Sequence, residues 1–214
     1  MRIDRLKREQ LRLNSRVRIE KLKNRIKYIA GVDVGRNQTM LFGAVVVLSF
    51  PELQILESTW AKVQERLPYI PGYLSFREVP VILRAYKKLK RRPELILVDG
   101  QGIAHPRRFG LATHLGVLLD LPTIGCAKSH LWGDYQMPAL RRGSFEFLRF
   151  NGERIGLVLR TRDGVKPLFV SPGHRVDFED CRDYVLNSTT RYRIPEPLRQ
   201  AHRLATERAR GWDV

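Results

Sequence analysis

Residues 96–106 read Ile-Leu-Val-Asp-Gly-Gln-Gly-Ile-Ala-His-Pro, and this stretch decides the fold. An apolar run of strand length ends at Asp99 and is followed by two glycines, Gly100 and Gly102. The pattern predicts a buried strand that presents Asp99 at its carboxyl end, where open α/β sheets place their chemistry. Taken alone, it is equally consistent with a strand, a glycine turn and a solvated aspartate.

A second strand ends in the same way, because residues 28–34 read Tyr-Ile-Ala-Gly-Val-Asp-Val and are apolar up to Asp33. If the strands that carry Asp33 and Asp99 are neighbours in one sheet, their carboxylates converge and repel each other unless a cation lies between them. Mg²⁺ suits such a site because it prefers oxygen ligands, and no Cys and His cluster competes for a softer metal.

The rest of the chain predicts alternating strands and helices without a repeat or linker that would divide it. One α/β domain over residues 1–214 is therefore expected. A turn is predicted at residues 35–38. Further strands are predicted at 41–50, 54–61, 123–127, 155–160 and 168–170. The predicted helices are about 4–26, from 78–80 to 89, 106–119, 178–189 and 197–210.

The chain is strongly basic, with 39 Lys and Arg against 22 Asp and Glu, a net charge of +17 and a pI near 10.5. This balance favours a polyanionic partner. The helix predicted at 4–26 is especially basic and has two interpretations. It is a phosphate-binding arm or, as we favour, a solvated helix that packs on the domain through an apolar stripe containing Ile3, Leu6, Leu13 and Val17.

Cys126 and Cys181 lie far apart in the sequence, in no spacing typical of a disulfide framework or a zinc site. No apolar run reaches the length of a membrane span, and the charged N-terminus does not resemble a signal peptide. We therefore expect an intracellular, cytoplasmic protein that has no membrane partner.

Residues 68–74, Pro-Tyr-Ile-Pro-Gly-Tyr-Leu, form a loop that two prolines hold extended. Tyr69 and Ile70 are then presented either as a wedge that enters a base stack, or as side chains of an ordinary turn that cap the core. The residues alone favour the ordinary turn. His105 lies in the loop after Asp99, where a phosphate contact is expected.

Glu78 has two interpretations as well. Ser75 and Glu78 have the spacing of a capping box, but Pro80 favours a helix that begins near Glu78, which leaves its carboxylate free as a third acid. Lys128 follows the strand at 123–127, and either meets a phosphate or is solvated. His202 falls on the apolar stripe of the last helix and is expected to face the protein body.

The chain contains a series of distinctive motifs: Gly-Val-Asp33, Pro68-Tyr-Ile-Pro-Gly72, Ser75-Phe-Arg-Glu78, Val-Asp99-Gly-x-Gly102, His105-Pro-Arg, Ala127-Lys-Ser129, Ser171-Pro-Gly-His174 and Pro195-Glu-Pro197 up to His202. In this order, the motifs resemble those of the endonuclease V family. The resemblance implies a ribonuclease H-like mixed central sheet flanked by helices. It also implies an endonuclease dependent on Mg²⁺, with Mn²⁺ as a possible substitute. Such an enzyme recognises DNA with deoxyinosine or other deaminated bases and hydrolyses the second phosphodiester bond 3′ to the lesion.

The resemblance also implies roles for individual residues. The expected catalytic set is Asp33, Glu78, Asp99, Lys128 and His202, and the expected metal ligands are Asp33, Asp99 and Glu78. The expected DNA contacts are Pro68, Tyr69, Ile70, Pro71, Gly72, Leu74, Gly100 and His105. Two alternatives stay open: an endoribonuclease specific for inosine in RNA, and a basic nucleic-acid-binding protein without catalysis.

Overall fold

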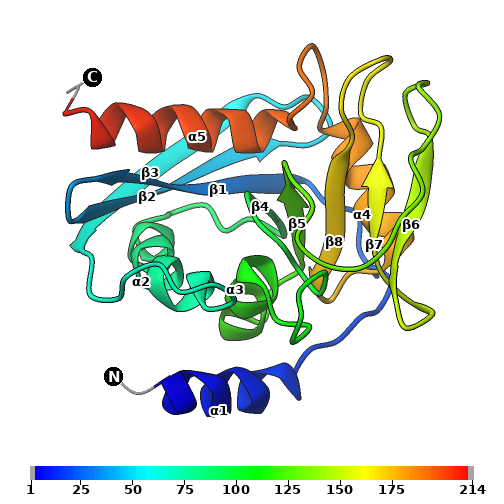
Figure 1. The fold of residues 1–214 in the computed structure, drawn as a ribbon. Helices are drawn as coiled ribbons and strands as arrows, with labels where there is room; N and C mark the ends of the chain where they lie inside the picture. Colours follow the sequence, from blue (N-terminus) through cyan, green and yellow to red (C-terminus); the bar gives the residue numbers. More distant parts are fainter. Residues whose placement is uncertain (1–2, 212–214) are drawn as a thin grey trace.

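A mixed sheet of eight strands forms the centre of the computed structural model, which describes residues 3–211 (Figure 1). The strands are β1 (Tyr28–Asn37), β2 (Met40–Ser49), β3 (Ile55–Gln64), β4 (Leu95–Val98), β5 (Thr123–Ala127), β6 (Phe145–Phe150), β7 (Glu153–Leu159) and β8 (Leu168–His174). Their order is β3-β2-β1-β4-β5-β8-β7-β6. The pairs β1–β4 and β4–β5 are parallel and the others antiparallel.

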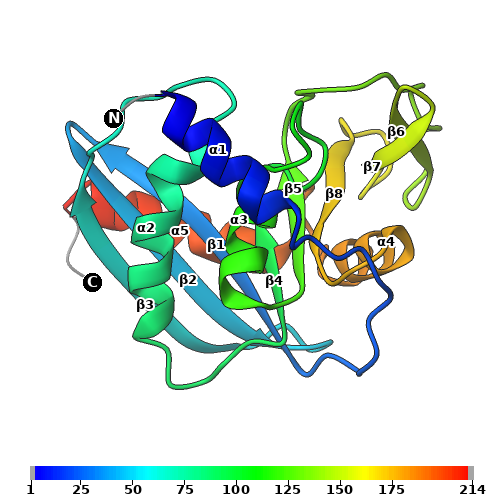
Figure 2. The same cartoon turned by 90° about the horizontal axis from the view of Figure 1, so that it is seen from below.

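Helices cover both faces of the sheet (Figures 1 and 2). They are α1 (Ile3–Asn14), α2 (Leu74–Lys87), α3 (Leu111–Leu119), α4 (Phe178–Asn187) and α5 (Glu196–Ala209). Buried side chains of α4 and α5 form one core cluster with the sheet, and those of α2 and α3 form a second cluster on its other face. The predicted mixed sheet with flanking helices is thus confirmed.

The first three strands form the predicted antiparallel meander, although β1 is longer than expected. Arg36 pairs with Leu41 and Asn37 with Met40, so the turn predicted at 35–38 is replaced by a tighter one after Asn37. Both cysteines are buried and free. Within residues 3–211, no helix combines the length and the apolar character that crossing a membrane requires. Residues 1–2 and 212–214 of the predicted domain lie outside the described residues.

The N-terminal helix is shorter than predicted. Helix was expected over about 4–26, but α1 ends at Asn14, and residues 15–27 continue to β1 without helical structure. Backbone amides in this segment bond to distant elements instead, as Leu22 N does to a carboxylate oxygen of Asp180 at 2.8 Å. Acceptors from distant parts of the folded domain therefore take the place of the backbone carbonyls that would accept these hydrogen bonds in a helix. The local hydrophobic periodicity of the sequence does not reveal such distant acceptors.

The start of α2 also differs from the prediction. The helix begins at Leu74 rather than near Glu78, and Pro80 lies inside it on an exposed face. The capping box is absent from the observed start, because the Ser75 hydroxyl lies 3.0 Å from Nδ1 of His114. The capping interpretation of Glu78 is therefore wrong.

Two further boundaries move. The helix predicted to open at Pro106 begins at Leu111, because the preceding loop folds on itself through a hydrogen bond from Gly110 N to Gly102 O at 3.0 Å. The strand predicted at 168–170 extends into the longer β8, and β6 was not predicted. Neither change alters the place where the pairing of β1 with β4 stops, at Val32 and Val98.

Candidate active site

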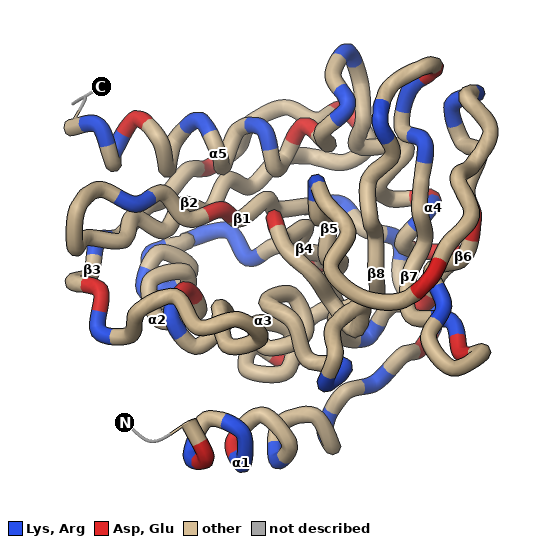
Figure 3. Tube along the Cα trace, in the orientation of Figure 1, with Lys and Arg blue, Asp and Glu red and all other residues tan. Residues whose placement is uncertain are grey.

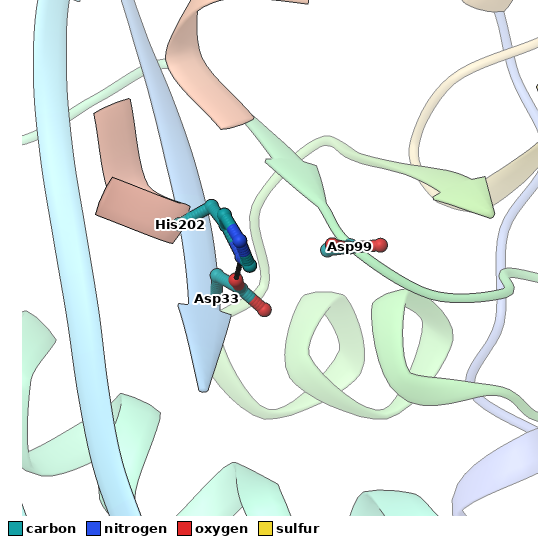
Figure 4. A group of neighbouring side chains, drawn as sticks. All are labelled: Asp33, Asp99 and His202. Atoms are coloured by element: carbon teal, nitrogen blue, oxygen red, sulfur yellow. Dashed lines mark hydrogen bonds and ion pairs between the residues drawn. The ribbon is translucent and has the colours of Figure 1, made fainter. Parts of the chain in front are cut away.

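Asp33 and Asp99 lie together at one edge of the sheet (Figure 4). β1 and β4 are parallel neighbours, and Val32 of β1 lies opposite Val98 of β4. Asp33 and Asp99 are the residues that follow this pair, so they occupy equivalent positions on the two neighbouring segments. The amide of Asp99 donates to the carbonyl oxygen of Val32 at 3.3 Å. The expected convergence of the two acids is confirmed, but only β4 ends at its acid: β1 continues to Asn37, so Asp33 lies within that strand, just past the point where its pairing with β4 stops.

Two glycines of β1 allow α5 to pack directly on the strand. A Cβ atom at Gly31 would lie 2.0 Å from the carbonyl oxygen of Pro197, and one at Gly35 would lie 2.6 Å from that of Ala205. Because these positions have no side chain, the helix backbone approaches the strand more closely than other residues allow. This approach brings His202 to the edge of the sheet.

His202 contacts Asp33 across this interface. Its Nδ1 lies 2.6 Å from Oδ2 of Asp33 (Figure 4). The His202 side chain is 60% exposed, so the expectation that it faces the protein body is wrong. Leu198 and Ala201 are buried against the sheet, and His202 lies at the margin of their stripe. The imidazole is consequently accessible at the carboxylate site.

Lys128 completes a cluster of alternating charges. It follows β5, the parallel neighbour of β4, and its ammonium group forms an ion pair with the Asp99 carboxylate. Arg193 Nη2 donates to the carbonyl oxygen of Lys128 at 3.0 Å and supports the backbone there. Lys128 therefore lies at the site, where the sheet order places it.

Glu78 approaches from α2, on the face of the sheet opposite to α5. Burial, together with the negative charge of Asp33, raises the pKa of Glu78 to about 8. Burial and Asp33 also raise the pKa of Asp99, although Lys128 acts in the opposite direction. Both pKa shifts arise first from burial, which disfavours the charged carboxylate, and second from the negative charge of Asp33.

The side chains fit a divalent cation. One ligand atom from each of Asp33, Asp99 and His202 lies within 4.8 Å of the others. Carboxylate oxygens are the ligands that Mg²⁺ prefers, and a cation would favour the charged form of Asp99, which burial and then the negative charge of Asp33 disfavour. This group contains His202 where the expected ligand set has Glu78. Glu78 lies outside the group of three, but its charge is coupled to that of Asp33.

The loop of residues 68–73 precedes α2 and is exposed at its outer end. Tyr69 is 62% exposed, so the ordinary-turn interpretation in which it caps the core is wrong. At the inner end, Tyr73 is buried and Gly72 adopts a φ of +79°. A glycine suits this left-handed conformation, which side chains disfavour. The loop is therefore fixed at Gly72 and open to solvent at Tyr69.

The other expected DNA contacts lie near this loop or near the start of α3. Leu74 is the first residue of α2, and a Cβ atom at Gly100 would lie 3.3 Å from the Leu111 side chain. His105 is 5% exposed, and burial lowers its pKa to about 4. Its Nδ1 accepts a hydrogen bond from the backbone N–H of Arg107 at 3.2 Å, so the ring faces the protein.

Two residues that fix the loop were missed in the sequence. Gln10 of α1 is completely buried, and the Nη2 atom of Arg107 donates to the carbonyl oxygen of Gly72 at 2.7 Å. Gln10 lies between Leu6 and Leu13 on the apolar stripe of α1, so its position in that stripe was a readable signal. Arg107 belongs to the predicted helix start and to the His105-Pro-Arg motif, neither of which indicates a contact with Gly72.

Cationic side chains continue from the site along α5. A hollow of about 420 Å³ begins at Lys128 and His202 and is lined by Arg199 and Arg203. Lys and Arg also recur in the segment between α1 and β1 (Figure 3). The α5 side chains provide a basic surface beside the carboxylates, whereas the segment between α1 and β1 lies at the opposite end of β1, where the backbone N–H of Lys27 bonds to Glu94.

The mixed sheet, its flanking helices and the two aspartates on parallel strands define a ribonuclease H-like protein with a carboxylate site. The family model for Endonuclease V matches residues 11–203. The chain belongs to the endonuclease V family and is an endonuclease.

Individual relatives agree with this assignment. Endonuclease V of Nostoc punctiforme is 51% identical over 189 residues, which cover 87% of this chain and 86% of that protein. The crystal structure of Endonuclease V from Streptomyces avermitilis has a TM-score of 0.93 and 40% identity, and the match covers 97% of this chain and 93% of that one. Ciona intestinalis Endonuclease V, in complex with a 24mer DNA containing an inosine followed by a ribo-adenosine, has a TM-score of 0.85 and 27% identity, with 99% of both chains covered.

Proposed function

We propose that this chain is a Mg²⁺-dependent DNA repair endonuclease that recognises deoxyinosine and hydrolyses the second phosphodiester bond 3′ to it. The observation that carries the proposal is the convergence of Asp33, Asp99 and His202 beside Lys128, in a chain with a net charge of +17. The inosine-containing DNA bound by the Ciona intestinalis enzyme supports the choice of substrate.

Asp33 and Asp99 would hold the ion, and Glu78 and His202 lie beside them. When bound, Mg²⁺ supplies Lewis-acid activation of water and offsets charge that develops on the phosphate. Asp33 orients the imidazole of His202 through Nδ1, so Nε2 is the nitrogen left to hold or move a proton. The Lys128 ammonium group stabilises negative charge on the scissile phosphate.

Recognition of the damaged base has a separate source. We infer that Tyr69, exposed at the tip of the loop, enters the base stack beside the lesion. Inosine pairs weakly, so its extrusion costs less than the few kcal/mol required for a normal pair. Gly72, Leu74 and Gly100 are proposed to line the pocket for the extruded base, with His105 behind the loop.

The test is nicking of a labelled duplex that contains one central deoxyinosine, in Mg²⁺, in Mn²⁺ and in EDTA. The controls are the undamaged duplex and a strand of the same sequence as RNA with inosine. We expect one metal-dependent cut at the second phosphodiester 3′ to deoxyinosine, which is lost in Asp33→Ala. Binding without cutting would overturn catalysis, and cutting of the RNA alone would assign inosine in RNA as the substrate.

A further inference from the structure

Gln10 is a buried polar side chain in a helix whose remaining polar residues are mostly exposed. It is completely inaccessible to solvent, and Leu13 beside it packs against Phe109 and Val117. The Gln10 amide nitrogen donates to the carbonyl oxygens of Phe109 at 3.0 Å and Gly72 at 3.3 Å. Its amide oxygen accepts from Nε of Arg107 at 2.5 Å. Both ends of the amide are thus used to join α1 to two loops.

Arg107 holds the same point of the 68–73 loop from a second direction. Its Nη2 donates to the Gly72 carbonyl oxygen at 2.7 Å, and its guanidinium group lies 4.3 Å from the centre of the Tyr73 ring. A Cβ atom at Gly72 would lie 2.5 Å from Nη2 of Arg107, so the guanidinium group occupies the space that a side chain would need. Gly72 is therefore fixed by direct contacts on two sides.

These contacts explain why α1 lies across α2 and α3 outside the main layers (Figures 1 and 2). We propose that α1 is a positioning element for lesion recognition, in which Gln10 and Arg107 hold Gly72 and thereby fix the loop that presents Tyr69. The inference rests on the proposed function, because Tyr69 is assigned there to the base stack. Gln10 is a positioning residue, since it acts through Gly72 and Arg107.

Fixing the loop before DNA binds has a physical benefit. A loop that must become ordered on binding loses affinity, by several-fold to about tenfold for each side chain that is immobilised. Pro68 and Pro71 stiffen the outer part of the loop, and Gln10 and Arg107 fix its inner end. The benefit applies to opening a duplex at a lesion, because a base in a single strand requires no unpairing.

The alternative role for α1 is a general basic arm, and it predicts a different pattern. Arg5, Arg8 and Arg12 are exposed on α1, and contacts from them to phosphates would strengthen binding to all nucleic acids alike. The proposal instead assigns to Gln10 an effect confined to damaged duplex.

The experiment compares wild type with Gln10→Leu, which keeps the size of the side chain and removes its three hydrogen bonds. Thr189→Val is the matched control, because Thr189 is a buried polar residue whose hydroxyl bonds to Val185 O at 2.7 Å in a different part of the protein. Arg107→Lys keeps the positive charge but removes the paired guanidinium donors that bond to Gln10 and Gly72. This variant tests the same attachment of Gly72 if Gln10→Leu does not fold. Binding and single-turnover nicking are measured on deoxyinosine duplex, deoxyinosine single strand and undamaged duplex.

We expect Gln10→Leu to weaken binding to the deoxyinosine duplex about tenfold. Binding to the other two nucleic acids, and nicking at saturating protein, should stay within about twofold of wild type. Equal losses on all three nucleic acids, or no loss on the damaged duplex, would overturn the inference.

Hydrogen–deuterium exchange of the free protein separates this inference from the proposed function. Gln10→Leu should speed exchange of the amides in residues 68–76 about tenfold, while Thr189→Val leaves them unchanged. Unchanged exchange in Gln10→Leu would overturn the positioning role even if wild type nicks deoxyinosine. Failure of wild type to distinguish deoxyinosine would overturn the proposed function and with it the role of the loop in recognition.

Discussion

His202 and Asp33 are 169 positions apart in the chain, yet Nδ1 of the histidine lies 2.6 Å from Oδ2 of the aspartate. The contact exists because α5 packs on the backbone of β1 at Gly31 and Gly35. The geometry of the site thus depends on the distance between α5 and β1, which is short because Gly31 and Gly35 have no side chains.

Gly31→Ala should therefore impair both stability and nicking. The new methyl group would meet the carbonyl oxygen of Pro197, and overpacking of this kind costs about 1–3 kcal/mol. We expect the displaced helix to separate His202 from Asp33 and to reduce nicking more than lesion binding, measured with urea unfolding and single-turnover assays. Gly164→Ala, in the strained turn between β7 and β8, should lose about 1 kcal/mol of stability without losing activity. Similar nicking by the two variants would contradict this dependence.

Tyr69→Ala should weaken binding to deoxyinosine duplex far more than it slows cleavage of bound strands. Stacking of an aromatic ring on a base contributes about 1–3 kcal/mol, so a loss of roughly tenfold or more in affinity is expected. Fluorescence anisotropy of a labelled duplex and single-turnover nicking measure the two effects. Tyr69→Phe keeps the ring and should bind like wild type. Equal effects of Tyr69→Ala on binding and cleavage would argue against a wedge.

The ends of the parallel strands could be predicted from sequence. Asp33, Asp99 and Lys128 each follow an apolar run of strand length, and adjacent parallel strands bring such residues to one edge. The prolines show where the Tyr69 loop lies in the sequence. The residues alone, however, favoured a tyrosine that caps the core, whereas Tyr69 is exposed. The local sequence pattern is therefore sufficient to place a side chain when its position depends only on which strand is buried and in which direction that strand runs.

Other features depend on contacts between distant elements and were not predictable in the same way. His202 lies at the margin of a buried stripe, and only the placement of α5 on β1 shows which side of that margin is open. The end of α1 at Asn14 depends on acceptors such as Asp180 that the folded domain supplies. Gln10 is bonded at both ends of its amide by partners from other loops.

His114 should make the protein less stable in mild acid. It is 5% exposed, and burial lowers its pKa from 6.5 to about 4, so protons bind preferentially to the unfolded chain below pH 6.5. The free energy of unfolding is not reduced by this group above pH 6.5, and it falls as the pH drops towards 4, by about 2 kcal/mol at pH 5. Urea unfolding at pH 7.5 and pH 5 should show a smaller loss for His114→Gln than for wild type. The same pH dependence in both proteins would contradict this assignment.

The most direct test of the carboxylate site is Asp99→Asn, which keeps the shape of the side chain and removes its negative charge. Asp183→Asn, an exposed change of the same charge on α4, is the control. Binding and Mg²⁺-dependent nicking of the deoxyinosine duplex are measured for both variants and for wild type. The account predicts that Asp99→Asn binds the duplex but loses several kcal/mol of transition-state stabilisation, a fall in nicking of more than about a hundredfold. Near-normal Mg²⁺-dependent nicking by Asp99→Asn would contradict the account and remove Asp99 from the active site.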